Sequence, residues 1–190
     1  VTKDPAFRQR YIVATQTPRE ENDRDRLLWV YDVQLDANDC LASAERIGAD
    51  DPAKGMKWYV YREITKPTPW FNNQGYVDTL NKKAIDRFIE ITHERYLQTV
   101  GDEFGKTVPA IFTDEPQFAS KQTLSFARPN DAADEVHLPW TDDLPETFFA
   151  AYGEDLGAHL PELLWELPDG KVSTVRYHYH DFLTERFTEA

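Results

Sequence analysis

Cysteine is almost missing from this chain of 190 residues, in which Cys40 is the only one. A single cysteine excludes an internal disulfide framework and a cysteine-rich zinc site, so stability must come from the burial of a core. The sequence also lacks an apolar run close to the roughly 18 residues of a membrane span, and its start, VTKDPAFRQR, lacks the apolar core of a signal peptide. We therefore expect no membrane partner, and the compartment stays open.

Basic residues are scarce, with 21 Lys and Arg against 34 Asp and Glu and a net charge of -13. This balance argues against nucleic acid and anionic lipid as partners and leaves neutral or cationic ligands. The chain starts without Met and ends within a predicted helix. We therefore expect a piece of a longer protein, with the rest of that polypeptide as a partner.

The first third of the chain is typical of antiparallel strands. Residues 27–36 are rich in β-formers, a turn signal DAND follows, and residues 40–47 alternate loosely, which predicts a hairpin. A further aromatic and β-branched run covers residues 56–64. These runs predict a three-stranded antiparallel meander over about residues 27–65.

A helix followed by a short apolar run comes next. Asn81 is a good helix cap, and Gly101 is a good end. Between them, one helical face carries Ile85, Phe88, Ile89, Thr92, Tyr96, Leu97 and Val100. The run VPAIFT at residues 108–113 is bounded by turn signals, which predicts a buried strand. A helix followed by a buried strand is half of a βαβ unit.

The last part of the sequence predicts helices after a second long polar loop. That loop covers residues 116–143, and Asp143 with Pro145 and Glu146 forms an Asp version of the capping box. The pattern predicts helices over about residues 144–152, 155–166 and 173–190.

The candidate chemistry lies in VPAIFTDEPQF, where a predicted strand ends in two acids. Side chains alternate along a strand, so only one of Asp114 and Glu115 projects into a given pocket. Pro116 disfavours a helical conformation for the residue before it and keeps Glu115 extended, which favours Glu115 as the aimed carboxyl group. Asp114 would then brace the loop. The alternative is that both acids are solvated turn residues.

Two stretches resemble a known enzyme family. They are YVDTLNKKAIDRFIEITHERYLQTVGDEFGKTVPAIFTDEPQF (76–118) and LPWTDDLPETFFAAYGEDLGAHLPELL (138–164), and they are similar to the catalytic region of family 106 glycoside hydrolases, the α-L-rhamnosidases and their relatives. The resemblance implies an O-glycosidase of rhamnoside-like substrates in which Glu115 is the general acid. TDEP also resembles the NEP motif of retaining barrel glycosidases, with Asp114 in place of Asn. The family implies a calcium ion near the sugar, although no calcium-binding loop pattern is present, so we predict no required cofactor or metal ligand.

The resemblance also implies an architecture. We predict an α+β chain with an antiparallel β-meander or insert at residues 1–65 and a β/α segment of a (β/α)8 TIM barrel at residues 66–190. The two would form one structural unit, with long loops at the active face. A glycosidase needs a second carboxylate about 5–9.5 Å from the acid, at a distance that separates retention from inversion. Asp78, Asp142 and Asp143 are candidates, as is an acid outside this chain.

Sugar binding calls for aromatic rings and for polar groups that bond hydroxyls. The loop at residues 65–81 offers Trp70, with Phe71 beside it, as well as Tyr76 and Asp78, while the second long loop offers Trp140 and the strand end before residue 65 offers Arg62 with Glu63. Each ring could instead fill a gap under a loop. The rival function is a non-catalytic carbohydrate-binding or scaffold module, in which the aromatic loops bind and the acids only cap.

Overall fold

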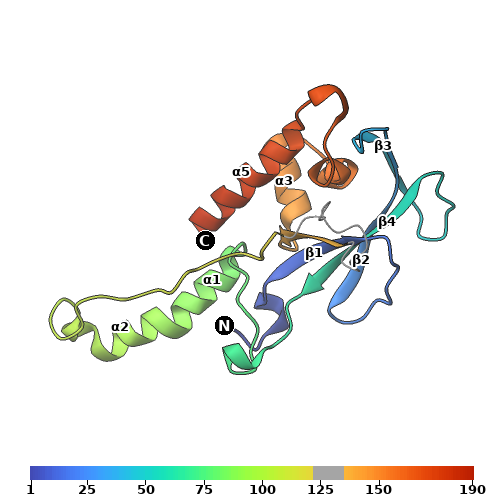
Figure 1. Cartoon of the computed structure of the whole chain (residues 1–190). Helices are drawn as coiled ribbons and strands as arrows, with labels where there is room; N and C mark the ends of the chain where they lie inside the picture. The colour runs from blue at the N-terminus through green and yellow to red at the C-terminus, as the bar shows by residue number, and fades with distance from the viewer. Residues whose placement is uncertain (122–134) are drawn as a thin grey trace.

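The computed structural model describes residues 1–121 and 135–190, and within them it shows one antiparallel sheet with helices on one face (Figure 1). The strand order is β3-β2-β4-β1-β5, and every pairing between these strands is antiparallel. The strands are β1 (Arg10–Thr15), β2 (Asp25–Leu35), β3 (Leu41–Ile47), β4 (Met56–Ile64) and β5 (Glu135–Trp140).

The predicted hairpin is confirmed, but the predicted meander order is wrong. β2 pairs with β3, and β4 then pairs with the other side of β2. β3 carries mostly exposed side chains, which suits an edge position, because an edge strand exposes much of its surface to water. β4 is buried along most of its length and lies in the middle of the sheet. The apolar side chains of β4 are buried in this central position between β2 and β1, whereas sequence order alone suggested β3 as its neighbour.

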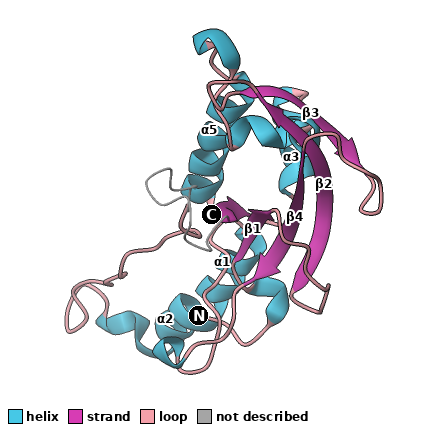
Figure 2. Ribbon diagram, turned by 45° about the vertical axis from the view of Figure 1, so that its right-hand side comes forward, coloured by secondary structure: helices cyan, strands magenta, loops and turns pink. Residues whose placement is uncertain are grey.

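One face of the sheet packs against α3 (Leu144–Tyr152), α4 (Leu156–His159) and α5 (Thr174–Glu189), as Figure 2 shows. Hydrogen bonds join the layers, since the Tyr179 hydroxyl donates to Pro139 O at 2.6 Å and the Tyr31 hydroxyl donates to Gly157 O at 2.5 Å. Large side chains fill the space between the layers. They include Ile12, Tyr31, Trp58, Val60, Leu138, Trp140, Leu144, Phe148, Leu160, Tyr179 and Leu183.

The predicted C-terminal helices are found, although one predicted cap is wrong. Pro145 lies in the first turn of α3, which ends at Gly153 with φ 70°. Asp143 does not cap this helix through its side chain. Its carboxylate instead accepts hydrogen bonds from Arg186 of α5 at 2.8 and 3.0 Å. The ion pair with Arg186, far along the chain, therefore takes the place of the expected N-cap hydrogen bond of Asp143. The predicted helix over 155–166 is shorter and continues from α4 as the helical turn η5 (Leu160–Leu163).

The predicted helix after Asn81 is confirmed and forms an arm beside the sheet (Figure 1). The Asn81 side chain accepts from Lys83 N at 3.1 Å. The helix runs through α1 (Lys82–Ile89), a π-helical turn η3 (Glu90–Glu94) and α2 (Arg95–Val100). The apolar face of this helix is only partly buried, since Tyr96 is 67% and Leu97 is 56% exposed.

The prediction of a (β/α)8 TIM-barrel segment is wrong. Residues 108–113 form no strand of the sheet, and Phe112 is 86% exposed. The parallel neighbours that a βαβ unit requires are not found among the strands of residues 1–121 and 135–190. A short apolar run has the same sequence pattern whether it is buried or exposed, and only partner strands decide between the two. The predicted loop 116–143 conversely contains β5, and its residues 122–134 lie outside the described part of the chain.

Candidate active site

Three segments singled out from the sequence meet at one end of the sheet, and Gln117 joins two of them. Its backbone N–H donates to the Tyr76 hydroxyl at 3.2 Å, and its carbonyl accepts from Thr79 Oγ1 at 2.8 Å. The Gln9 side chain donates to the same carbonyl at 3.3 Å. The acidic segment that ends at Gln117 is therefore fastened along the loop of residues 65–81.

Asp78 joins that loop to the third segment, which follows β5. Its carboxylate accepts from Thr141 Oγ1 at 2.9 Å and from Leu80 N at 3.1 Å. The residue is 1% exposed. Burial raises the pKa of Asp78 to about 6, against the smaller opposing effects of these two hydrogen bonds and of nearby Arg10. Asp78 thus links the two segments structurally. Thr141 lines the pocket that adjoins Asp142, whereas Asp78 does not.

Asp142 is held by two arginines at this end of the sheet. Arg10 Nε of β1 lies 2.9 Å from its carboxylate, and Arg62 Nε of β4 lies 3.7 Å from it. Arg10 is 5% exposed, whereas the Asp142 side chain is 57% exposed. The arginines therefore fix a carboxylate that solvent and a ligand can still reach. A pocket of about 360 Å³ adjoins it, lined by Leu80, Asn81, Lys82, Lys83, Thr141, Asp142, Asp143, Arg186 and Glu189.

Glu115 and Asp114 are exposed and do not line this pocket. The expectation that Pro116 keeps Glu115 extended is wrong, because Glu115 has φ 26°, a left-handed conformation that is strained for a residue with a side chain. Among the described residues, no hydrogen bond or ion pair engages the Glu115 carboxylate. The strand alternation that was expected to aim Glu115 does not apply, since residues 108–115 form no strand.

The aromatic rings that were predicted to bind sugar differ in their exposure to solvent. Trp140 is 2% exposed and packs edge-to-face on Trp29 at 5.7 Å, so it is a core residue that cannot stack on a ligand. Trp70 is 88% exposed. Tyr76 packs against Phe71 at 5.4 Å, and its hydroxyl holds Gln117.

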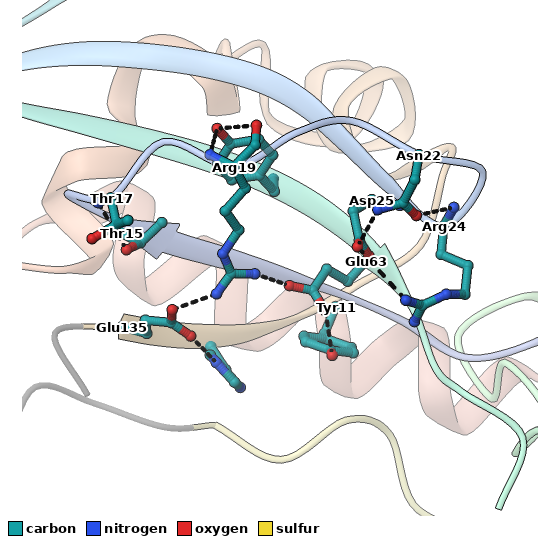
Figure 3. A network of polar contacts seen from close by, with 11 residues as sticks. Tyr11, Thr15, Thr17, Arg19, Asn22, Arg24, Asp25, Glu63 and Glu135 are labelled. Carbon is teal, nitrogen blue, oxygen red and sulfur yellow. Dashed lines mark hydrogen bonds and ion pairs between the residues drawn. The ribbon is translucent and has the colours of Figure 1, made fainter. Parts of the chain in front are cut away.

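The sequence did not reveal a polar cluster that lies on the face of the sheet opposite the helices (Figure 3). Arg19, in the loop after β1, bridges Glu63 of β4 and Glu135 of β5. The Tyr11 hydroxyl donates to Glu63 at 2.7 Å. Partial burial by itself raises the pKa of Glu135, but the hydrogen bond and charge of Arg19 outweigh it and lower that pKa. The register of β1, β4 and β5 creates this cluster, and no local pattern could have shown it.

Within residues 1–121 and 135–190, no group of three or more His, Cys, Asp or Glu side chains is arranged to hold a metal ion. No helix in these ranges is long and apolar enough to cross a membrane. Comparison of the chain with protein-family models, curated proteins and solved structures gives no match. The likeness to family 106 glycoside hydrolases therefore stays a prediction from the sequence.

Proposed function

We propose that this chain carries part of a glycoside hydrolase site that cleaves the O-glycosidic bond of a rhamnoside-like substrate, with Glu115 as the general acid. One observation carries the proposal. The acidic segment is fastened at Gln117 to the loop bearing Tyr76 and Asp78, and Asp78 is bonded to the residue before Asp142. These bonds fasten the two segments that carry Glu115 and Asp142 to the same loop, and both carboxylates are accessible to solvent.

The two carboxylates divide the roles that glycoside hydrolysis requires. One carboxylic acid protonates the leaving oxygen, and a second carboxylate assists at the anomeric carbon, either directly or through a water molecule. Glu115 is exposed to an incoming substrate, and its strained backbone is of the kind found at functional positions. Asp142, oriented by Arg10 and Arg62, is the second carboxylate that we propose.

A different observation favours the rival function, a non-catalytic carbohydrate-binding module. Nothing among the described residues aims the Glu115 carboxylate, since no hydrogen bond or ion pair reaches it. Trp70, by contrast, is fully available to a ligand at 88% exposure. A module of this kind binds the glycan and leaves it intact.

Turnover of aryl α-L-rhamnosides and related aryl glycosides separates the two functions. We expect Glu115→Gln to lower kcat by roughly 100-fold to 10,000-fold, because it removes the transferable proton. Asp142→Asn should also lower kcat if Asp142 is the second carboxylate. Glu94→Gln, at an exposed helical position, is the matched control and should keep the parent rate.

Circular dichroism and the denaturation midpoint show whether each variant keeps the fold. A folded Glu115→Gln protein with the parent rate would contradict the assignment of the acid. Sugar binding without turnover in the unaltered protein would support the binding module instead.

A further inference from the structure

The arm helix, from Lys82 to Val100, carries four charged residues in an ordered row. Residues 83, 87, 90 and 94 follow one another at spacings of four, three and four, so they lie along one side of the helix. All four are exposed. The first two are the bases Lys83 and Arg87, and the last two are the acids Glu90 and Glu94. We call these four residues the charged row.

The helix's own dipole does not explain this order of charges. Acids stabilise the N-terminus of a helix and bases stabilise its C-terminus. The first turn of α1 contains no acid and begins with Lys82 and Lys83. The last turn of α2 contains no base, and Asp102 and Glu103 follow it. The charges are therefore placed against the dipole at both ends of the arm helix.

The charged row is complementary to itself when one copy is reversed. An antiparallel copy, placed about a twofold axis between residues 88 and 89, brings Lys83 opposite the partner's Glu94 and Arg87 opposite the partner's Glu90. A twofold axis gives both copies the same contacts, as in most homodimers. Arg87 and Glu90 pair within the helix at 2.5 Å, but both side chains are at least 50% exposed. Such a pair contributes little, so it can be exchanged for pairs between copies.

Apolar side chains adjoin the charged row. Ile91 lies four residues after Arg87 and Leu97 lies three residues after Glu94, which makes them neighbours on the helix surface. Ile91 is 43% exposed and Leu97 is 56% exposed. Of the eleven large apolar side chains that are exposed in the described residues, six lie between residues 89 and 112. Apolar exposure is therefore concentrated on the arm, which is typical of an interaction surface.

The arm is also a place where two copies can approach without net repulsion. The whole chain has a net charge of -13, whereas residues 82–113 contain five bases and five acids. Like net charges repel each other, so a second copy is disfavoured at the acidic remainder of the chain. Figure 1 shows α2 at the end of the arm that lies farther from the sheet. An antiparallel pair of arms would thus keep the two acidic bodies at opposite ends.

We propose that two copies of this chain associate through their arm helices, antiparallel and about a twofold axis. The charged row of each copy pairs with that of the other, and Ile91 and Leu97 become covered. The arm helix is about 28 Å long, so the interface is small and the dimer is weak. This association is independent of the proposed hydrolase activity.

Sedimentation equilibrium of the 190-residue chain tests the dimer. The apparent mass should rise from 22.1 kDa towards twice that value as the concentration increases about 100-fold at low salt. Added salt should weaken the association, because it screens exposed charges. A chain that stays monomeric at every concentration would overturn the dimer and would favour a different polypeptide as the partner of the arm.

Charge reversal tests the antiparallel register. Lys83→Glu with Arg87→Glu makes the whole charged row acidic, and Glu90→Lys with Glu94→Lys makes it basic. Each variant alone should associate at least about 10-fold more weakly than the parent, because like charges then face each other. An equimolar mixture of the two should associate again, since an acidic row faces a basic one. Self-association of both variants at the parent strength, or a mixture that stays monomeric, would overturn the proposal.

A matched control separates the position of the charges from their number. Lys66→Glu with Lys171→Glu changes the net charge by the same amount at exposed positions outside the arm, and it should associate like the parent. Circular dichroism shows whether each variant keeps its helix content. An equal loss of association in this control would assign the effect to net charge and would contradict the arm interface.

Discussion

Replacing Asp78 by Asn should make the protein more stable than the parent at neutral pH and should remove part of its pH dependence. Asp78 is 1% exposed, and among residues 1–121 and 135–190 its carboxylate meets two hydrogen-bond donors but no ion-pair partner. An ionised carboxylate in such a place pays for desolvation, which Asn does not. Asn keeps the size of the side chain and the acceptor for Leu80 N, and the Thr141 hydroxyl can turn to accept from the new amide.

The magnitude follows from the pKa of Asp78, which rises from 3.8 to about 6 in the folded protein. Because the folded state binds this proton more tightly than the unfolded state, the contribution of Asp78 to stability is fully present below pH 4. It is lost as pH rises through 6. At about 1.4 kcal/mol for each pH unit, the loss is on the order of 3 kcal/mol. Above pH 7 the contribution stays constant.

Urea denaturation of the two proteins from pH 4 to pH 8 measures this effect. The free energy of unfolding of Asp78→Asn, minus that of the parent, should increase by about 2.5 kcal/mol over this range, most of the full effect, and then level off. Taking the difference cancels the titration of the other carboxylates. Asp102→Asn, at an exposed position, is the control and should show a flat difference. A flat difference for Asp78→Asn, or one that falls with pH, would refute the reasoning.

Two further substitutions test the packing and the polar cluster. Phe148 is fully buried between Tyr152 and Phe182, so Phe148→Ala should lower the free energy of unfolding by about 3–5 kcal/mol. Phe149 is 58% exposed on the same helix, and Phe149→Ala should change that free energy by no more than about 0.5 kcal/mol. Equal losses of the two variants in urea denaturation would contradict the assigned core. Arg19→Gln should cost about 1–2 kcal/mol at pH 7 because it leaves Glu63 and Glu135 without their shared cation. The pKa of Glu135 is lowered in the folded protein, so the loss of stability in Arg19→Gln should shrink as pH falls through that pKa. Arg95→Gln, at an exposed position, is the control. A loss that is independent of pH, or as small as that of the control, would argue against the bridge.

Local signals in the sequence predicted local structure well. Asn81 caps its helix as expected, Pro145 lies in the first turn of α3, and the paired runs at residues 27–36 and 40–47 form a hairpin. Each of these features depends on residues only a few positions apart. Of the residues singled out for the site, Arg62 and Asp142 lie 3.7 Å apart, a contact that no local pattern predicted, and Trp140 is a core residue.

The sequence by itself determined where helices begin, which runs can be strands, and the net acidic charge of the chain. Only the tertiary structure decided that β5 joins β1, that residues 108–113 remain outside the sheet, and that Asp143 binds Arg186 instead of capping α3. The reason is physical. Caps and turns depend on short-range hydrogen bonds, whereas strand pairing and burial depend on partners far along the chain, and a short apolar run has no preference of its own between a sheet and solvent until those partners are in place.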